Sequence, residues 1–155
     1  GLPAALGAKV ATTAGSAEKL AVCRELGADL AINYKEQDFS PLVLEATAGR
    51  GVDVILDTIG AKYLEPNLMA LAVGGRVTTI GLLGGRSAEL NLGLMLAKQV
   101  TWRATSLRGR PGADKGRICG GVGRSMWAQG ESRLIKPVAG RVIPMKSEEH
   151  KTERQ

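Results

Sequence analysis

The sequence is poor in cysteine, in aromatic residues and in long apolar runs. Two cysteines, Cys23 and Cys119, stand far apart, and aromatic residues make up 3% of the 155 residues. Two distant cysteines form neither a metal-ligand motif nor a disulfide framework, so we expect no metal site and a reducing, cytoplasmic environment. No apolar run reaches the ~18 residues of a membrane span, and the N-terminal residues lack the basic region of a signal peptide. We therefore expect a protein without a membrane partner.

Charge is distributed unevenly along the chain. Residues 1–90 contain 8 basic and 10 acidic side chains, a net of −2, whereas residues 91–155 contain 13 and 5, a net of +8. A basic half can bind nucleic acid, an anionic cofactor or an acidic partner. These basic residues are scattered between glycines, and few aromatic rings are available for stacking on bases. The pattern favours a solvated basic face over nucleic-acid binding.

Short β-prone segments alternate with segments of helical periodicity. Ser16 is a good N-cap and Gly27 a good C′ residue for one of the predicted helices. The strands are expected over residues 8–13, 29–33, 52–56, 76–80 and 100–106, and the helices over 17–26, 38–48, 63–72 and 92–98. A further helix over 111–128 is interrupted by glycines, each of which costs about 1 kcal/mol relative to alanine. Because the strands are mostly apolar, the order predicts an α/β fold, a Rossmann-like doubly wound parallel sheet.

Three loops that follow predicted strands have the composition of a ligand-binding edge. They are residues 13–16 together with Lys19, residues 57–60, and residues 81–85. Ligands of open parallel sheets bind outside the carboxyl ends of the strands, and glycine there lets a cofactor approach the backbone. Each loop alone reads as an ordinary tight turn. Three of them at one edge indicate a nucleotide site.

The first of these loops indicates which dinucleotide would bind. NAD sites usually place an acidic residue after the second strand, to bond the ribose 2′-hydroxyl. Small neutral residues occupy that place here, followed by Ser16 and Lys19, and Tyr34 follows the next strand. A hydroxyl, a helix N-terminus and an ammonium group favour a 2′-phosphate, which indicates NADP(H). The alternatives are a solvated Lys19 and a Tyr34 that only packs.

The sequence resembles a known family. Five motifs carry the resemblance: AGSAEKL, CRELGADLAINYKEQDFS, GRGVDVILDTIGAKYLEPNL, LAVGGRVTTIGLLGG and VTWRATSLRGRP. They are similar to the cofactor domain of zinc-independent NADPH:quinone oxidoreductases of the medium-chain dehydrogenase/reductase superfamily. The resemblance spans about 110 consecutive residues and resumes weakly over 133–145. It implies metal-free hydride transfer from NADPH to quinones or related electrophilic carbonyl compounds, by a homodimer.

The resemblance also implies roles for particular residues. Ser16, Lys19 and Tyr34 would hold the ribose that carries the 2′-phosphate. The remaining positions would lie along the cleft and around the nicotinamide half: Gly60 in the cleft, Gly81, Leu82 and Leu83 beside the nicotinamide ribose, and Thr105, Ser106 and Leu107 at the nicotinamide. No catalytic side chain is implied, because the cofactor supplies the hydride and the protein positions it.

The sequence departs from the family pattern at both of its ends. The family's substrate domain, first strand and glycine-rich pyrophosphate turn would precede residues 2–7, so the resemblance leads us to expect a sequence that lacks them. Without that central strand, its two neighbours would expose unpaired edges. We expect residues 1–145 to form a partial NADP(H)-binding domain, residues 146–155 to form a charged tail, and the chain to be inactive alone. The alternative is a non-catalytic nucleotide-binding module, or one that dimerises through the strand at 100–106.

Overall fold

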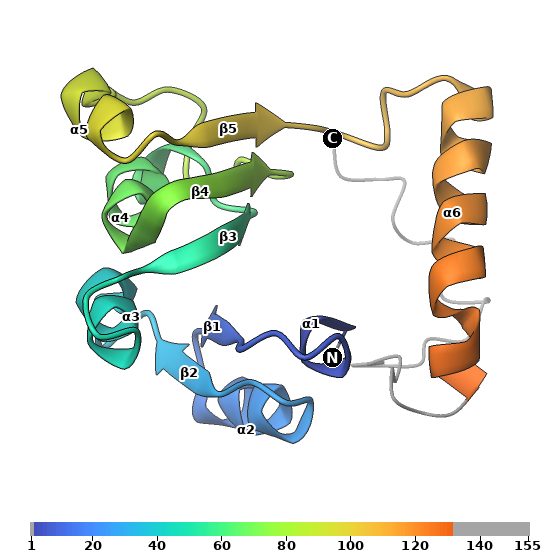
Figure 1. Ribbon diagram of the computed structural model, residues 1–155, viewed down its shortest axis with the longest axis horizontal. Coiled ribbons are helices and arrows are strands. Elements are labelled where there is room, and N and C mark those ends of the chain that lie inside the picture. Colours follow the sequence, from blue (N-terminus) through green and yellow to red (C-terminus); the bar gives the residue numbers. More distant parts are fainter. Residues whose placement is uncertain (1, 132–155) are drawn as a thin grey trace, which may run out of the picture.

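A computed structural model describes residues 2–131, in which helices alternate with parallel strands (Figure 1). The order is α1 (Leu2–Ala5), β1 (Ala11–Ala14), α2 (Ala17–Glu25), β2 (Leu30–Asn33), α3 (Phe39–Ala46), β3 (Val52–Asp57), the 3-10 turn η1 (Ala61–Tyr63), α4 (Leu64–Ala70), β4 (Leu71–Thr79), α5 (Leu92–Ala97), β5 (Thr101–Ala104) and α6 (Gly112–Glu131). The predicted α/β class is confirmed. The weak resemblance over 133–145, the domain boundary at 145 and the charged tail lie outside the described residues.

Local caps set the bounds of α2, as the sequence predicts. The Ser16 hydroxyl accepts a hydrogen bond from the Lys19 backbone N–H, and the helix begins at the next residue after Ser16. At the other end Gly27 adopts φ +92°, and the N–H of Ala28 donates to the Cys23 carbonyl. Glycine adopts this left-handed conformation without the steric cost that a Cβ atom brings. Both ends of α2 are therefore encoded in its immediate neighbours.

The strands form two separate parallel sheets. β1 pairs with β2, and β3, β4 and β5 pair in that order. Within residues 2–131 no strand lies between β1 and β3, and Figure 1 shows the two sheets side by side with this break between them. The break falls between the two strands that were expected to flank the family's first strand. It leaves one backbone edge of β1 and one of β3 without a partner strand in the described part of the chain.

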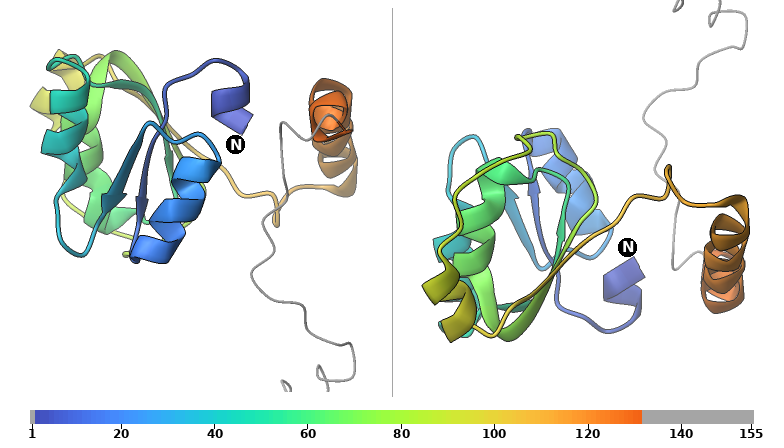
Figure 2. Two further views of the ribbon diagram at one scale, coloured as in Figure 1. Left: turned by 90° about the horizontal axis from the view of Figure 1, so that it is seen from below. Right: turned by 90° about the horizontal axis from the view of Figure 1, so that it is seen from above.

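Helices lie on both sides of the strand layer, with α2 packed on β1 and β2. In Figure 2, α2 lies on one side of the strand layer, and α3 and α4 lie together on the other side. The core under α3 and α4 is aliphatic: Ile32, Val43 and Ala70 form one buried cluster, and Leu68, Leu71 and Val77 are buried almost completely. This arrangement is the doubly wound, Rossmann-type architecture that the alternation predicts.

The segment from α4 to β4 differs from the sequence-based prediction. The predicted helix over 63–72 ends at Ala70, and β4 begins directly at Leu71 rather than at residue 76. Gly74 and Gly75 therefore lie inside the strand instead of ending a helix. They fall where the pairing of β3 with β4 shifts from Val52–Leu71 to Val54–Arg76, and Gly74 has φ +75°. A bulge of this kind accommodates glycine well, so the pair reads locally as a break although the strand continues.

Two further elements differ from expectation. β1 spans Ala11–Ala14 rather than residues 8–13, so its end lies one residue closer to Ser16. α6 is continuous over Gly112–Glu131 despite its glycines, where a poor helix was expected. Figures 1 and 2 show α6 apart from the strands, opposite the carboxyl ends of β3, β4 and β5. A methyl group at Gly116 or Gly123 would meet nothing within 4 Å, so these glycines are not required by packing.

Candidate functional site

The first group of predicted site residues surrounds the Gly15 turn, where β1 and β2 end. The Tyr34 backbone N–H donates to the Ala14 carbonyl at 3.3 Å, which joins the two strand ends. A methyl group at Gly15 would lie 2.7 Å from the Tyr34 hydroxyl oxygen, so the ring lies directly over this turn. A larger residue at position 15 would displace Tyr34. Tyr34 and the turn before Ser16 are thus brought together.

The N-terminus of α2 lies within this group. Ser16 uses its hydroxyl as an acceptor for the Lys19 N–H at 3.4 Å, and Lys19 stands in the first turn of the nine-residue helix. The other backbone N–H groups of that turn and the helix dipole favour an anion at this place. Glu18 also stands in the first turn and opposes that preference in part. Lys19 adds a mobile positive charge to the same end.

Lys35 belongs to this group, although the sequence analysis did not single it out. The Lys35 side chain passes within 3.2 Å of the place that a Gly15 methyl group would occupy. Its backbone N–H donates to the Asn33 side chain, which fixes the turn after β2. The signal in the sequence is its position directly after Tyr34. A second ammonium group beside the Gly15 turn increases the attraction for a phosphate.

The second group is built on Asp57, the last residue of β3. Asp57 is only 3% exposed, and its carboxylate accepts from the backbone N–H groups of Ile59 at 2.9 Å and Gly60 at 3.1 Å. It also accepts from the Thr79 hydroxyl on β4 at 3.2 Å. Gly60 has φ +79°, a conformation that suits glycine. The turn after β3 is therefore held by a buried side chain at its own start.

Backbone hydrogen bonds join this turn to the loop after β4. The N–H groups of Leu83 and Gly84 donate to the carbonyls of Thr58 and Ile59, and the Ala61 N–H donates to the Gly85 carbonyl at 3.1 Å. The loops approach so closely that a methyl group at Gly60 would lie 2.8 Å from the Gly85 oxygen, and one at Gly81 would lie 2.8 Å from the Thr58 oxygen. Gly60, Gly81 and Leu82 are thus brought together.

Exposed leucines lie around these joined loops. Leu82 is 51% exposed and Leu83 is 84% exposed. The loop after β5 joins the group through Thr105, whose N–H donates to the Thr79 carbonyl at 3.0 Å and whose hydroxyl accepts from Arg110. Ser106 and Leu107 are exposed and lie on the segment that leads away to α6 (Figure 1).

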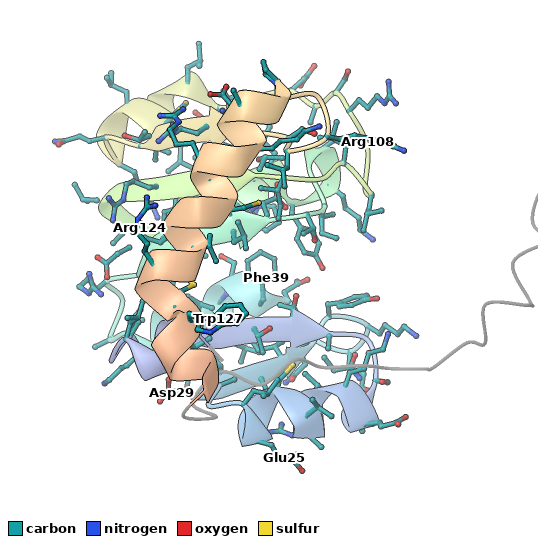
Figure 3. The ribbon with its side chains drawn as sticks, turned by 90° about the vertical axis from the view of Figure 1, so that its right-hand side faces the viewer. Glu25, Asp29, Phe39, Arg108, Arg124 and Trp127 are labelled. Carbon is teal, nitrogen blue, oxygen red and sulfur yellow. The ribbon has the colours of Figure 1, made fainter. Side chains whose placement is uncertain are left out.

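Aromatic residues lie between the two groups. The rings of Phe39 and Tyr63 contact each other with centroids 5.1 Å apart, and Figure 3 shows Phe39 at the level between the two sheets. Burial raises the pKa of the Tyr63 phenol, and Tyr34, Asp38 and Asp57 raise it further. Phe39 begins α3, which follows β2, and Tyr63 ends the turn η1, which follows β3. The ring contact therefore joins the segments that follow these two strands.

Two kinds of feature are absent from the described part of the chain. Among residues 2–131, no group of three or more histidine, cysteine, aspartate or glutamate side chains could hold a metal ion. Over the same residues, no helix is both long and apolar enough to cross a lipid bilayer.

Comparison with known proteins agrees with this arrangement. The profile of a family described as zinc-binding dehydrogenase matches residues 2–115. A quinone oxidoreductase of Rattus norvegicus is 31% identical over 139 residues, covering 90% of this chain and 40% of that protein. Quinone oxidoreductase 1 of Escherichia coli is 35% identical over 94 residues, covering 61% of this chain and 29% of that protein.

The fold also matches that of a solved quinone oxidoreductase structure. The crystal structure of Escherichia coli quinone oxidoreductase complexed with NADPH superposes with a TM-score of 0.74 at 29% identity. The match covers 89% of this chain and 42% of that one. The chain therefore spans less than half the length of these relatives.

Proposed function

The chain belongs to the zinc-binding dehydrogenase family and is quinone oxidoreductase-like, as the sequence motifs predicted; from this we propose that it is the NADP(H)-binding portion of an NADPH-dependent oxidoreductase. Its acceptors would be quinones or related electrophilic carbonyl compounds. Residues 1–145 would form this portion and residues 146–155 a separate tail. The free thiols of Cys23 and Cys119 fit our proposal of a cytoplasmic location.

The observation that carries the cofactor proposal is the chemistry of the Gly15 turn. β1 ends at Ala14 and is followed by Gly15 and Ser16, where NAD-binding domains usually place an acidic residue. Lys19 and Lys35 supply positive charge there, and Tyr34 covers the turn. A ribose 2′-phosphate would therefore lie at the N-terminus of α2, with Ser16, Lys19 and Tyr34 as its ligands. NADH, which lacks this phosphate, would gain nothing from the lysines.

The second group fits the nicotinamide half of the same cofactor. Gly60, Gly81, Leu82 and Leu83 would line its ribose, and the loop of Thr105, Ser106 and Leu107 would reach the nicotinamide ring. Exposed leucines on these loops offer an apolar surface against which a planar ring can lie. When bound, NADPH supplies a hydride, and these residues would position the nicotinamide and exclude water from it.

Thermal unfolding of the chain with each cofactor tests the proposal. NADPH should raise the midpoint of unfolding and NADH should raise it much less, because only NADPH carries the 2′-phosphate. Lys19→Glu should remove this difference, since a carboxylate would repel the phosphate. Lys9→Glu, the same charge change at an exposed residue before β1, serves as the control and should leave the difference intact. Equal midpoints with NADPH, NADH and buffer would contradict the proposal.

A surface beside β5 favours a second role, association with a copy of the same chain. β5 pairs only with β4, so its outer edge is open among the described residues. Next to it, α5 presents Leu92 at 68% and Leu96 at 80% exposure, around an apolar depression that also includes Met95 and Val100. An open strand edge beside exposed leucines is typical of a subunit contact. We therefore propose a homodimer through residues 100–106.

Sedimentation velocity of the chain tests this second role. It should show a dimer that Leu96→Glu converts to monomer. A wild-type chain that is monomeric at all concentrations would contradict the proposed dimer.

A further inference from the structure

Among the described residues, Asp57 is a buried carboxylate that no cationic side chain pairs with. Within residues 2–131 no lysine or arginine lies within salt-bridge distance of it, and only 3% of the residue is exposed. Burying a charge is costly unless hydrogen bonds replace the lost water. The N–H groups of Ile59 and Gly60 and the Thr79 hydroxyl provide those bonds, at 2.9, 3.1 and 3.2 Å. The fold therefore keeps this group by means of a dedicated set of donors.

The donor set extends to the third strand of the sheet. The Trp102 indole N–H donates to the Thr79 hydroxyl oxygen at 2.9 Å. An indole nitrogen only donates, so the Thr79 oxygen accepts there and its own proton is directed to the Asp57 carboxylate. These two side-chain hydrogen bonds, from Trp102 to Thr79 and from Thr79 to Asp57, link β5 to the carboxyl ends of β4 and β3. Each group donates to the next one, because an indole N–H can only donate and an ionised carboxylate can only accept.

The end of this network is the turn that carries Gly60. Asp57 holds the N–H groups of Ile59 and Gly60, and the same turn carries the Thr58 and Ile59 carbonyls that accept from Leu83 and Gly84. The position of the loop at 81–85 thus depends on the turn at 57–60. Loss of the carboxylate would free the Gly60 N–H inside a buried region, and the paired loops would have to shift to satisfy it.

We propose that Asp57, oriented by Thr79 and Trp102, is a positioning residue that sets the nicotinamide half of the NADP(H) site. The inference rests on the proposed function and extends it from the residues that would touch the cofactor to a buried network behind them. Because the nicotinamide half is the same in NADPH and NADH, Asp57 affects both cofactors alike. Lys19, at the opposite end of the site, affects only NADPH. The two residues therefore have separable signatures.

The test measures dissociation constants for NADPH and NADH by cofactor fluorescence, with the full chain and matched variants. Asp57→Asn should weaken both cofactors by about tenfold and leave their ratio unchanged, the effect of losing one charge-assisted hydrogen bond. Thr79→Val removes the hydroxyl and should act in the same direction, whereas Thr79→Ser keeps the hydroxyl and should bind as the wild type does. Asp53→Asn is the control, because Asp53 lies on the same strand with its side chain 69% exposed and paired with Arg50.

Amide hydrogen exchange provides a readout that needs no cofactor. In Thr79→Val and Asp57→Asn, the amides of Ile59 and Gly60 should exchange at least tenfold faster, while the Thr47 amide, bonded to Val43 at the end of α3, keeps its rate. Wild-type affinity for both cofactors in both variants would overturn the inference and leave the proposed function standing. So would a lower unfolding midpoint with unchanged affinity, or unchanged exchange at Ile59 and Gly60. A wild-type chain that binds neither cofactor would overturn the proposed function itself, and the inference with it.

Discussion

Lysine side chains have two distinct roles in this chain. Lys19 and Lys35 stand beside the Gly15 turn, where their charge is available to a ligand. Lys98 points inward instead: its ammonium group donates to the carbonyls of Met69 at 2.7 Å and Leu71 at 2.6 Å, at the end of α4. Burial lowers the pKa of Lys98. Because α4 passes directly into β4, these carbonyls have no helical partner, and Lys98 satisfies them.

Replacing Lys98 should therefore destabilise the fold. Lys98→Met keeps the length of the side chain and removes its donors, which leaves two carbonyls short of a partner. We expect a loss of about 1–2 kcal/mol in the free energy of unfolding, measured by urea denaturation. Lys9→Met, at an exposed lysine, is the control and should change it by less than about 0.5 kcal/mol. Equal effects of the two substitutions would contradict the role assigned to Lys98.

Gln99 gives a prediction of opposite sign. Gln99 lies just after α5 and has φ +50°. The N–H of the next residue, Val100, donates to the Met95 carbonyl. A residue with a Cβ atom is strained in this left-handed conformation, which glycine adopts freely. Gln99→Gly should stabilise the chain by about 0.5–1 kcal/mol in the same denaturation assay. Gln99→Ala keeps the Cβ atom and should give no gain, and a gain from alanine alone would refute this explanation.

A hydrogen bond could be predicted from the sequence only where its two residues lie close together along the chain. The bounds of α2 could be predicted because Ser16 and Gly27 act on adjacent backbone groups. The bonds of Asp57 to Thr79 and of Thr79 to Trp102 could not, since each joins residues more than 20 positions apart. The loops were identified by their glycines, and the buried carboxylate that holds them was not.

At the scale of elements, α6 and the turn after β3 show two opposite uses of glycine. Gly116 and Gly123 lie in a helix where an added methyl group would meet nothing. Gly60 has φ +79° and an added methyl group there would collide with the Gly85 carbonyl. Gly116 and Gly123 therefore lower the stability of α6, whereas Gly60 is required by the packing of two loops. Composition alone could not separate them, which is why α6 was expected to be a poor helix.

Alanine substitutions should distinguish these two classes of glycine. Gly116→Ala and Gly123→Ala should each stabilise α6 by about 0.5–1 kcal/mol and raise the helical signal in circular dichroism. Gly60→Ala should instead destabilise the chain, because neither its φ nor its surroundings accept a Cβ atom. A fall in helical signal for the α6 variants would show that their glycines are needed for packing.

At the scale of the whole molecule, the main feature is the division of the strands into two sheets. β4 is the central strand of its sheet, with partners on both sides, whereas β1 and β3 each have one open edge among the described residues. The apolar side chains of Val54 and Leu56 on β3 are 57% and 67% exposed. In a complete doubly wound sheet, central strands are covered on both faces. The division agrees with the expectation that the two neighbours of the family's first strand have open edges in this sequence.

Hydrogen exchange should reveal the same division. Amides of β4 should exchange slowest, and those of β1 much faster, because an unpaired edge and a two-stranded sheet open at low free energy. The measurement is residue-resolved exchange of the full chain at neutral pH. Uniform protection of β1 and β4 would mean that the two sheets are stabilised as one unit, contrary to the topology described here.

The central claim is that the strand ends form one NADP(H) site. A titration of the isotope-labelled chain with NADPH, followed by amide chemical shifts, tests it most directly. We predict that the shifts change at two places together: at residues 15–19 with Tyr34, and at Gly60 with residues 81–83. NADH should perturb the second place more than the first. Unchanged spectra, or changes confined to α6, would contradict the account.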